Sequence, residues 1–184
     1  MIKSLILGGV RSGKTRYAQH RAIKSGLPVR LIVTGQALDA EMAERIKKHQ
    51  ASRPENWEVI EVPLDLPENI LKACHPKVCV IVDCLTLWLS NYLCQRPESF
   101  EKASHTLLEA VDQANGTLFL VSNEVGFGIV PDNELARRFR DEAGRLHQQL
   151  GQRCNEIKLI VAGQSLSLKD VPWFDCEDFH HEPI

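Results

Sequence analysis

The sequence predicts an α/β fold with a mostly parallel sheet flanked by helices, and three observations carry this prediction. Short apolar runs alternate with helical stretches along the chain of 184 residues, which is the pattern that builds parallel sheets. The run "VCVIVD" at 78–83 is continuously apolar up to its last residue, as expected for a strand buried on both faces, and "TLFLVS" at 117–122 is another buried strand. No internal repeat or low-complexity tract interrupts the pattern.

The expected elements follow one another from the N-terminus. Strands are expected at 4–7, 29–34, 57–62, 78–83, 117–122 and 156–163. Helices are expected from "SGKT" to Gly26, from Asp39 to about 51, at about 85–95, at about 100–114 and at about 132–150. Asp39 can cap its helix, which carries Met42 and Ile46 on one face. The strand at 57–62, "WEVIEV", alternates in polarity, which favours a place at the edge of the sheet.

Composition excludes several classes of protein. The chain is 43% hydrophobic and 25% charged, which suits a single domain over 1–184 that ends in an acidic tail at 170–184. A formal net charge of −2 gives no overall attraction to nucleic acid or to an anionic membrane. The apolar N-terminus is too short for a signal peptide and no segment approaches ~18 apolar residues, so we expect a cytoplasmic protein without a membrane span.

Six cysteines lie at 74, 79, 84, 94, 154 and 176, and none forms a C-x-x-C pair. Cys79 and Cys84 fall in or beside a buried strand, so reduced core thiols are favoured over disulfides or a zinc site. Cys176 with His180 and His181 could bind a metal, but a loosely ordered acidic tail is the favoured interpretation of this segment.

The strongest motif is "GGVRSGKT", which fits the phosphate-loop pattern G-x-x-x-x-G-K-[ST] between a strand and a helix. Its glycines let backbone N–H groups face phosphate oxygens, and the helix N-terminus adds positive partial charge. Lys14 can reach the β- and γ-phosphates, and Thr15 can ligate Mg²⁺. The motif predicts a P-loop NTPase-like (RecA-like) fold with a nucleotide site at these residues: Gly8, Gly9, Val10, Arg11, Ser12, Gly13, Lys14 and Thr15.

Asp83 ends the buried strand at 78–83 and is the natural second contact for Mg²⁺, directly or through water. Beside a phosphate loop, a carboxylate at a strand end is an informative feature, although such residues are common in loops. The chain lacks the N-K-x-D guanine signature, and its D-x-x-G, "DEAG" at 141–144, falls inside a helical pattern. A GTPase switch is therefore disfavoured, and a small-molecule kinase or a nucleotidyltransferase remains.

His49 lies beside the apolar stripe of the helix expected from Asp39, with Lys47, Lys48 and Arg53 around it. Neighbouring cations disfavour the imidazolium form, so this histidine would stay neutral and nucleophilic, and the same cations would attract phosphates. A neutral imidazole can attack phosphorus and hold a nucleotidyl group covalently. The plainer interpretation is a packed or surface histidine on a solvated basic face.

Several stretches resemble one family, the bifunctional adenosylcobinamide kinase / adenosylcobinamide-phosphate guanylyltransferases of cobalamin biosynthesis. They cover most of residues 4–163 and are "ILGGVRSGKTRYAQ", "DAEMAERIKKHQASRPENWEVIE", "VDCLTLWLSNYL" and "VSNEVGFGIVPDNELARRFRDEAGRLHQQL". The resemblance implies that adenosylcobinamide is phosphorylated with ATP or GTP. GMP from GTP is then transferred to adenosylcobinamide phosphate, which gives adenosyl-GDP-cobinamide and pyrophosphate. It also implies a homotrimer that acts on these small molecules.

The family resemblance assigns roles to individual residues. It makes His49, which precedes "QASRP", the guanylylated nucleophile, and where many relatives have two adjacent histidines this chain has Lys48 and His49. Family members often have Glu where this chain has Asp83, whose shorter side chain would still suit Mg²⁺. The guanylyl site would be lined by Thr34, Gly35, Gln36, Gln50, Ala51, Ser52, Arg53 and Glu61.

Other roles stay open on the sequence. Glu124, in "NEVGFG" after a buried strand, would orient a substrate hydroxyl or a metal-bound water, or else is a structural carboxylate. Arg11 would touch phosphate or point to solvent, and "LWLSNYL" at 87–93 would be an interface or core. A kinase that lacks the transferase half, and a GTP-binding regulatory protein without catalysis, are the alternatives to the bifunctional enzyme.

Overall fold

The computed structural model describes residues 1–37, 39–40, 43–44, 47 and 53–169. In this part of the chain the strands are β1 (Lys3–Gly8), β2 (Val29–Val33), β3 (Glu58–Glu61), β4 (Cys79–Asp83), β5 (Thr117–Asn123), β6 (Glu156–Val161) and β7 (Gln164–Ser167). The α-helices are α1 (Lys14–Lys24), α3 (Leu66–Ala73), α4 (Leu85–Gln95), α5 (Phe100–Gln113) and α6 (Glu134–Arg153), with a 3-10 turn at Pro97–Ser99 before α5.

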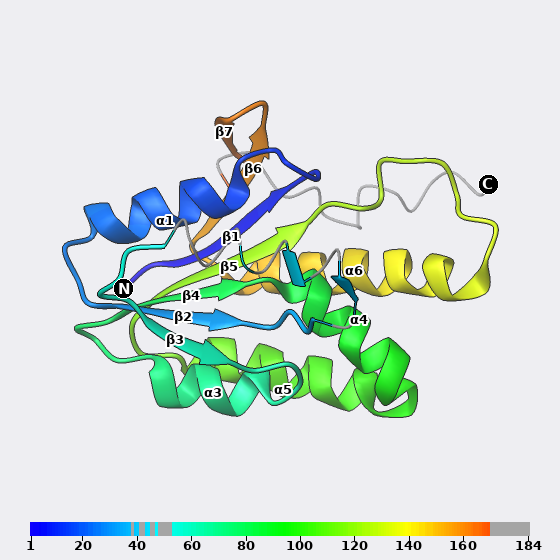
Figure 1. The fold of residues 1–184 in the computed structure, drawn as a ribbon, viewed down its shortest axis with the longest axis horizontal. Helices are drawn as coiled ribbons and strands as arrows, with labels where there is room; N and C mark the ends of the chain where they lie inside the picture. Colours follow the sequence, from blue (N-terminus) through cyan, green and yellow to red (C-terminus); the bar gives the residue numbers. More distant parts are fainter. Residues whose placement is uncertain (38, 41–42, 45–46, 48–52, 170–184) are drawn as a thin grey trace, which may run out of the picture.

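The strands form one sheet in the order β3-β2-β4-β5-β1-β6-β7 (Figure 1). Every pairing is parallel except that of β6 with β7, which is an antiparallel hairpin. The mostly parallel sheet confirms the predicted fold class, and β3 lies at the edge as its alternating sequence indicated. β5 lies between β1 and β4 and runs parallel to both. The carboxyl ends of these three strands therefore lie side by side at the same end of the sheet.

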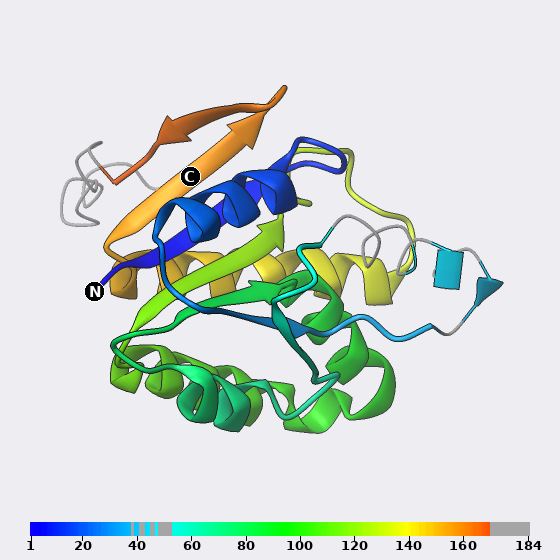
Figure 2. The same cartoon turned by 60° about the vertical axis from the view of Figure 1, so that its left-hand side comes forward.

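Helices cover both faces of the sheet. α1 lies on one face, and α3, α4, α5 and α6 lie on the other (Figures 1 and 2). The central strands have buried side chains on both faces, so β5 sends Leu118 and Leu120 into the core on the α4–α6 side and Phe119 and Val121 into the core under α1. This alternation explains why the sequences of these strands are continuously apolar.

The "LWLSNYL" stretch is core. It forms most of α4, where Trp88 and Leu89 are almost completely buried. The Trp88 ring packs edge-on against Tyr92 at 5.1 Å between centroids and lies 5.9 Å from Phe100. Its indole Nε1–H donates to the carbonyl of Leu64 at 2.7 Å, so the one polar atom of the ring is satisfied.

The structure corrects the sequence prediction in two places. α3 was missed, although Pro67 in its first turn and Asp65 before it are typical of a helix start. The last predicted strand, 156–163, is too long, because the chain turns at Ala162 and Gly163, both with positive φ, and returns as β7. The helix predicted from Asp39 to about 51 lies largely outside the described residues, as does the tail with Cys176, His180 and His181.

The structure also bears on the state of the cysteines, on metal-binding clusters and on membrane-spanning helices. The five cysteines in the described ranges are free, and burial raises the pKa of Cys79 to about 12 and that of Cys84 to about 11. Within the part of the chain that the structure describes, no group of three or more His, Cys, Asp or Glu side chains is placed to hold a metal ion. Over the same residues, no helix has the length and apolar character needed to cross a membrane.

Candidate active site

The glycine-rich loop joins β1 to α1 and has the geometry of a phosphate-binding turn. Gly8 ends β1 with φ of 153°, and a Cβ there would collide with the carbonyl of Ile160 on the neighbouring strand. Gly13 has φ of 101° and precedes the first residue of α1. Because L side chains rarely adopt these backbone conformations, both glycines are needed for the loop to curl over the helix N-terminus.

The β6–β7 hairpin braces this loop. The Gly163 N–H donates to the Ser12 carbonyl at 3.0 Å, and the Ser12 N–H donates to Gly9 O at 3.3 Å. The Ser12 hydroxyl is buried and has no hydrogen-bond partner. An unpaired polar atom inside such a loop fits a site whose polar ligand completes the hydrogen bonding.

Lys14 lies inside the loop rather than in solvent. Its Nζ donates to the Gly9 carbonyl at 2.6 Å, and its side chain is almost fully buried. Burial lowers the pKa of Lys14 from its ordinary value, although Cys84 and Asp83 act in the opposite direction. A cation held in a partly desolvated loop interacts more strongly with an incoming phosphate than an exposed lysine does.

Thr15 and Asp83 meet across the site. The Thr15 hydroxyl donates to Asp83 Oδ2 at 3.0 Å, which links the first turn of α1 to the end of β4. A hydroxyl and a carboxylate are hard oxygen ligands of the kind that Mg²⁺ prefers, usually together with phosphate oxygens and waters. The pair therefore fits a magnesium ion bound together with a nucleotide.

A cavity of about 850 Å³ opens from this loop across the carboxyl ends of the strands. Ligands of open parallel sheets bind at this edge. Predicted site residues that line the cavity are Val10, Arg11, Ser12, Gly13, Lys14, Thr15, Gly35, Gln36, Arg53, Glu61 and Asp83. Its other lining residues, which sequence reasoning did not single out, are Arg16, Val33, Ala37, Pro63, Cys84, Leu87, Val121 and Asn123. Arg11 therefore borders the cavity.

An arginine and a glutamate line the same cavity as the phosphate loop. Glu61 ends β3, and Arg53 precedes that strand. Burial lowers the pKa of Arg53, while Asp83 and Glu61 act to raise it, so both carboxylates are within electrostatic reach of the guanidinium. The lining of the cavity thus includes a cation and an anion in addition to the residues of the loop.

Three predicted residues are placed differently. Thr34 is fully buried, and its hydroxyl donates to the Cys84 carbonyl at 2.7 Å and accepts from the Cys84 N–H at 3.1 Å, so it joins the ends of β2 and β4. Gly8 and Gly9 shape the loop without bordering the cavity. His49, Gln50, Ala51 and Ser52 lie outside the described residues.

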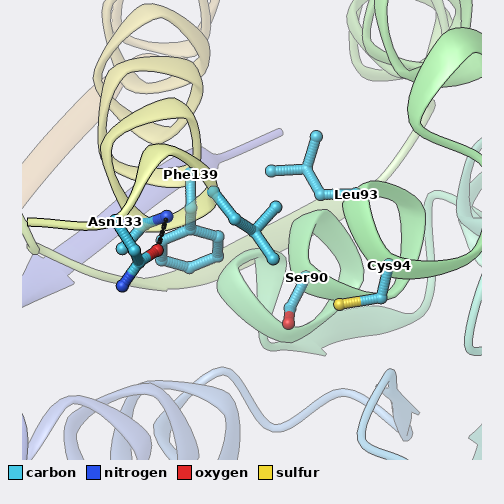
Figure 3. Close-up of a pocket in the computed structure, with 7 residues that line it drawn as sticks. Ser90, Leu93, Cys94, Asn133 and Phe139 are labelled. Carbon is cyan, nitrogen blue, oxygen red and sulfur yellow. Dashed lines mark hydrogen bonds between the residues drawn. The ribbon is translucent and has the colours of Figure 1, made fainter.

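A second, smaller hollow of about 260 Å³ lies between α4 and α6 (Figure 3). Leu93, Cys94 and Phe139 line it together with Asn133, whose side-chain oxygen accepts from the Ala136 N–H at 2.7 Å and caps α6. Its lining holds no cluster of charged groups, so we assign it no chemistry.

Comparisons with known proteins agree on one family. Residues 4–168 match the family model described as cobinamide kinase / cobinamide phosphate guanyltransferase. A bifunctional adenosylcobalamin biosynthesis protein CobP from Pseudomonas aeruginosa is 46% identical over 172 residues, which is 93% of this chain and 99% of that protein. The Escherichia coli K12 protein CobU, described in the same words, is 37% identical over 179 residues, covering 90% of this chain and 98% of its own length.

Solved structures with distant sequences share the fold. A Pyrococcus horikoshii OT3 protein matches with a TM-score of 0.57 at 12% identity, over 93% of this chain and 87% of that one. The RadB recombinase matches with a TM-score of 0.50 at 16% identity, over 86% of this chain and 73% of that one. At such low identity, these likenesses show the fold alone.

Proposed function

The chain belongs to the cobinamide kinase / cobinamide phosphate guanyltransferase family, and from this premise we propose that one nucleotide cavity serves both reactions. The protein is a bifunctional enzyme of cobalamin biosynthesis, a kinase and a guanylyltransferase. We assign the two steps as phosphorylation of adenosylcobinamide by ATP or GTP, followed by transfer of GMP from GTP to adenosylcobinamide phosphate. The observation that carries the proposal is that one cavity is lined both by the phosphate loop and by Arg53 and Glu61.

In the kinase step, the loop and its lysine hold the triphosphate. Backbone N–H groups of the loop and the N-terminus of α1 would bind the β- and γ-phosphates, and Lys14 would release Gly9 O to contact them. Phosphoryl transfer depends mainly on positioning and on charge stabilisation, and the loop supplies both. Thr15 and Asp83 would hold Mg²⁺, which when bound neutralises charge on the phosphate oxygens.

In the transferase step, we propose that His49 attacks the α-phosphorus of GTP. The bond from the α-phosphorus to the bridging oxygen breaks, pyrophosphate leaves, and the phosphate oxygen of the acceptor later displaces the histidine. Arg53 supports this assignment, because it follows His49 closely in sequence and borders the cavity, where it can stabilise charge on the α-phosphate. Glu61, Gly35 and Gln36 border the same cavity and are the described residues we assign to the guanylyl site.

Intact-mass spectrometry after incubation with GTP and Mg²⁺ tests the proposal. The unaltered protein should gain one GMP-sized, acid-labile adduct, and His49→Ala should gain none while still binding GTP. His20→Ala, at an exposed position of α1, is the matched control and should form the adduct normally. If the folded, GTP-binding protein forms no adduct, the covalent mechanism is wrong and the kinase step alone remains.

We also propose that the protein assembles as a homotrimer, as the family resemblance implies. Large apolar side chains in the segment between β5 and α6 support an interface, because Phe127 is 85% exposed and Ile129 is 97% exposed in the isolated chain. Light scattering should then give three times the chain mass of 20.7 kDa. A monomer mass at micromolar concentration would contradict this assembly.

A further inference from the structure

A buried histidine lies next to a carboxylate where β5 ends. His147, on α6, places Nε2 2.7 Å from the hydroxyl of Ser122 and Nδ1 3.7 Å from Glu124 Oε2. Ser122 and His147 are both almost fully buried, whereas the Glu124 side chain is 19% exposed. The imidazole of His147 therefore extends from α6, in the helix layer (Figure 1), to the carboxyl end of β5. The cavity lies at this end of the sheet.

The position of Glu124 places its backbone next to the start of the phosphate loop. β5 lies between β1, which leads into that loop, and β4, which ends at Asp83. The Glu124 N–H donates to the carbonyl of Gly8 at 3.0 Å, so its backbone is joined to the first residue of the loop motif. The preceding residue, Asn123, already borders the nucleotide cavity. Glu124 does not itself line that cavity, but it is the next residue after one that does, and its backbone is bonded to the start of the phosphate loop.

The carboxylate is held but retains capacity to accept hydrogen bonds. Oε1 accepts from the Gly126 N–H at 2.6 Å, whereas the distance from Oε2 to His147 is too long for a full hydrogen bond and is an electrostatic attraction. A carboxylate has about four lone-pair sites, so further sites remain for a substrate hydroxyl.

The histidine has a defined state in this setting. Burial lowers the pKa of His147, and Glu124 opposes that shift without reversing it. In the neutral ring one nitrogen accepts and the other carries hydrogen, and the arrangement that suits both neighbours has Ser122 donating to Nε2 and the Nδ1–H facing Glu124. The ring then fixes the direction of the carboxylate without adding a buried charge.

We propose that Glu124 accepts the hydrogen of the acceptor hydroxyl in the kinase step, and that His147, backed by Ser122, is the positioning residue for that carboxylate. The inference rests on the proposed kinase function. The alcohol oxygen forms a bond to the γ-phosphorus, the bond from the γ-phosphorus to the β–γ bridging oxygen breaks, and the nucleoside diphosphate leaves. The hydroxyl proton passes to the Glu124 carboxylate and then to solvent.

A purely structural role for Glu124 would be to cap the turn at Gly126, and such a cap has no need of a buried histidine behind it. The two roles differ in which reaction they affect. Formation of the guanylyl adduct from GTP involves no acceptor hydroxyl, so it should not depend on the Glu124–His147 pair. A turn cap, in contrast, would support the loop for both reactions alike.

The test measures kinase turnover with adenosylcobinamide and ATP beside the yield of the GMP adduct, in Glu124→Gln, His147→Leu and His147→Gln. Glu124→Gln should lower kinase kcat by about 100-fold, the lower range for general acid–base catalysis, with KM for ATP within about twofold. His147→Leu should lower kcat by about 10-fold or more through misplacement of the carboxylate, and His147→Gln should recover part of it. All three should form the adduct in normal yield. His105→Leu, on the exposed face of α5, is the matched control and should change neither activity.

Kinase turnover of Glu124→Gln within twofold of the unaltered enzyme would overturn the inference. So would a parallel loss of kinase turnover and adduct in the histidine variants, because that result indicates a role in the fold. If His147→Leu does not fold, the kinase turnover and adduct yield of Glu124→Gln and His147→Gln still test the inference. An unaltered protein that phosphorylates adenosylcobinamide without forming an adduct contradicts the proposed transferase mechanism and leaves the kinase measurements as a valid test of Glu124.

Discussion

The hydroxyl of Thr15 donates to Asp83 Oδ2 at 3.0 Å, although the two residues are 68 positions apart in the sequence. One belongs to the first turn of α1 and the other ends β4 on the far side of β5. Because the hydroxyl gives its hydrogen to the carboxylate, its oxygen lone pairs are free to face a cation. The fold has therefore placed a hydroxyl and a carboxylate side by side in the cavity that Lys14 also lines, and these are oxygen ligands of the kind that magnesium prefers.

Asp83→Asn should raise the Mg²⁺ concentration needed for half-maximal kinase activity by about 10-fold or more, a typical loss for a disturbed metal site. The amide keeps an oxygen but loses the negative charge that attracts the cation. The measurement is a magnesium titration at saturating nucleotide, with Asp112→Asn, in an exposed ion pair with Arg153, as the control. A titration curve that matches the unaltered enzyme would show that Asp83 does not bind the metal.

Lys14→Met should separate activity from stability. Loss of the ammonium should lower kcat/KM by about 100-fold or more, as when one preorganised donor to a developing charge is removed. Thermal stability should stay equal or rise, because Lys14 is almost fully buried and a methionine avoids the desolvation of a charge. Lys24→Met, exposed in the last turn of α1, controls for loss of a positive charge. A large drop in the melting temperature of Lys14→Met alone would mean that Lys14 mainly supports the fold.

Much of the fold follows from local sequence. The buried strands and long helices were predicted with boundaries within a few residues, because continuous apolar runs and helical spacing are local properties. α3 was missed because it is short and two prolines surround its start, at Pro63 and Pro67. β7 was missed because its pairing with β6 depends on a tight turn at Ala162 and Gly163.

The candidate site also has one part that local sequence predicts and another part that depends on tertiary packing. The phosphate loop is contiguous in sequence, so its residues were predictable from the motif. Gly35 and Gln36 border the cavity, whereas the Thr34 hydroxyl is bonded to the backbone of Cys84, a contact that the sequence could not show because the two residues are far apart in the chain. His147 could not be predicted, because only the packing of α6 against β5 brings it to Ser122 and Glu124.

Gly163→Val should weaken nucleotide binding although Gly163 lies outside the motif. Its φ of 76° disfavours a β-branched side chain, and the turn donates a hydrogen bond to the Ser12 carbonyl of the phosphate loop. Gly26 has a similar φ of 69° with nothing within 4 Å of an added Cβ, so Gly26→Val is a matched control for backbone strain.

Both valine variants should lose at least about 1–2 kcal/mol of unfolding free energy, the cost of the left-handed conformation for one residue. Only Gly163→Val should also raise the Kd for ATP, by about 10-fold or more if the loop loses one backbone hydrogen bond of about 1.5 kcal/mol. Calorimetric titration measures the affinity. Equal ATP affinities in the two variants would show that the hairpin does not brace the loop.

Trp88→Ala should lower the free energy of unfolding by about 3–5 kcal/mol, the usual cost of truncating a buried tryptophan or phenylalanine. The variant leaves a cavity against Tyr92 and Phe100 and an unpaired carbonyl at Leu64. Urea unfolding measures the loss, with Leu71→Ala, 43% exposed on α3, as a control expected to lose about 0.5 kcal/mol or less. The remaining folded protein should bind ATP normally, because Trp88 does not border the cavity. Similar urea midpoints for the two variants would show that α4 is not a main part of the core, and a raised Kd for ATP would show that α4 also holds the end of β4 in place.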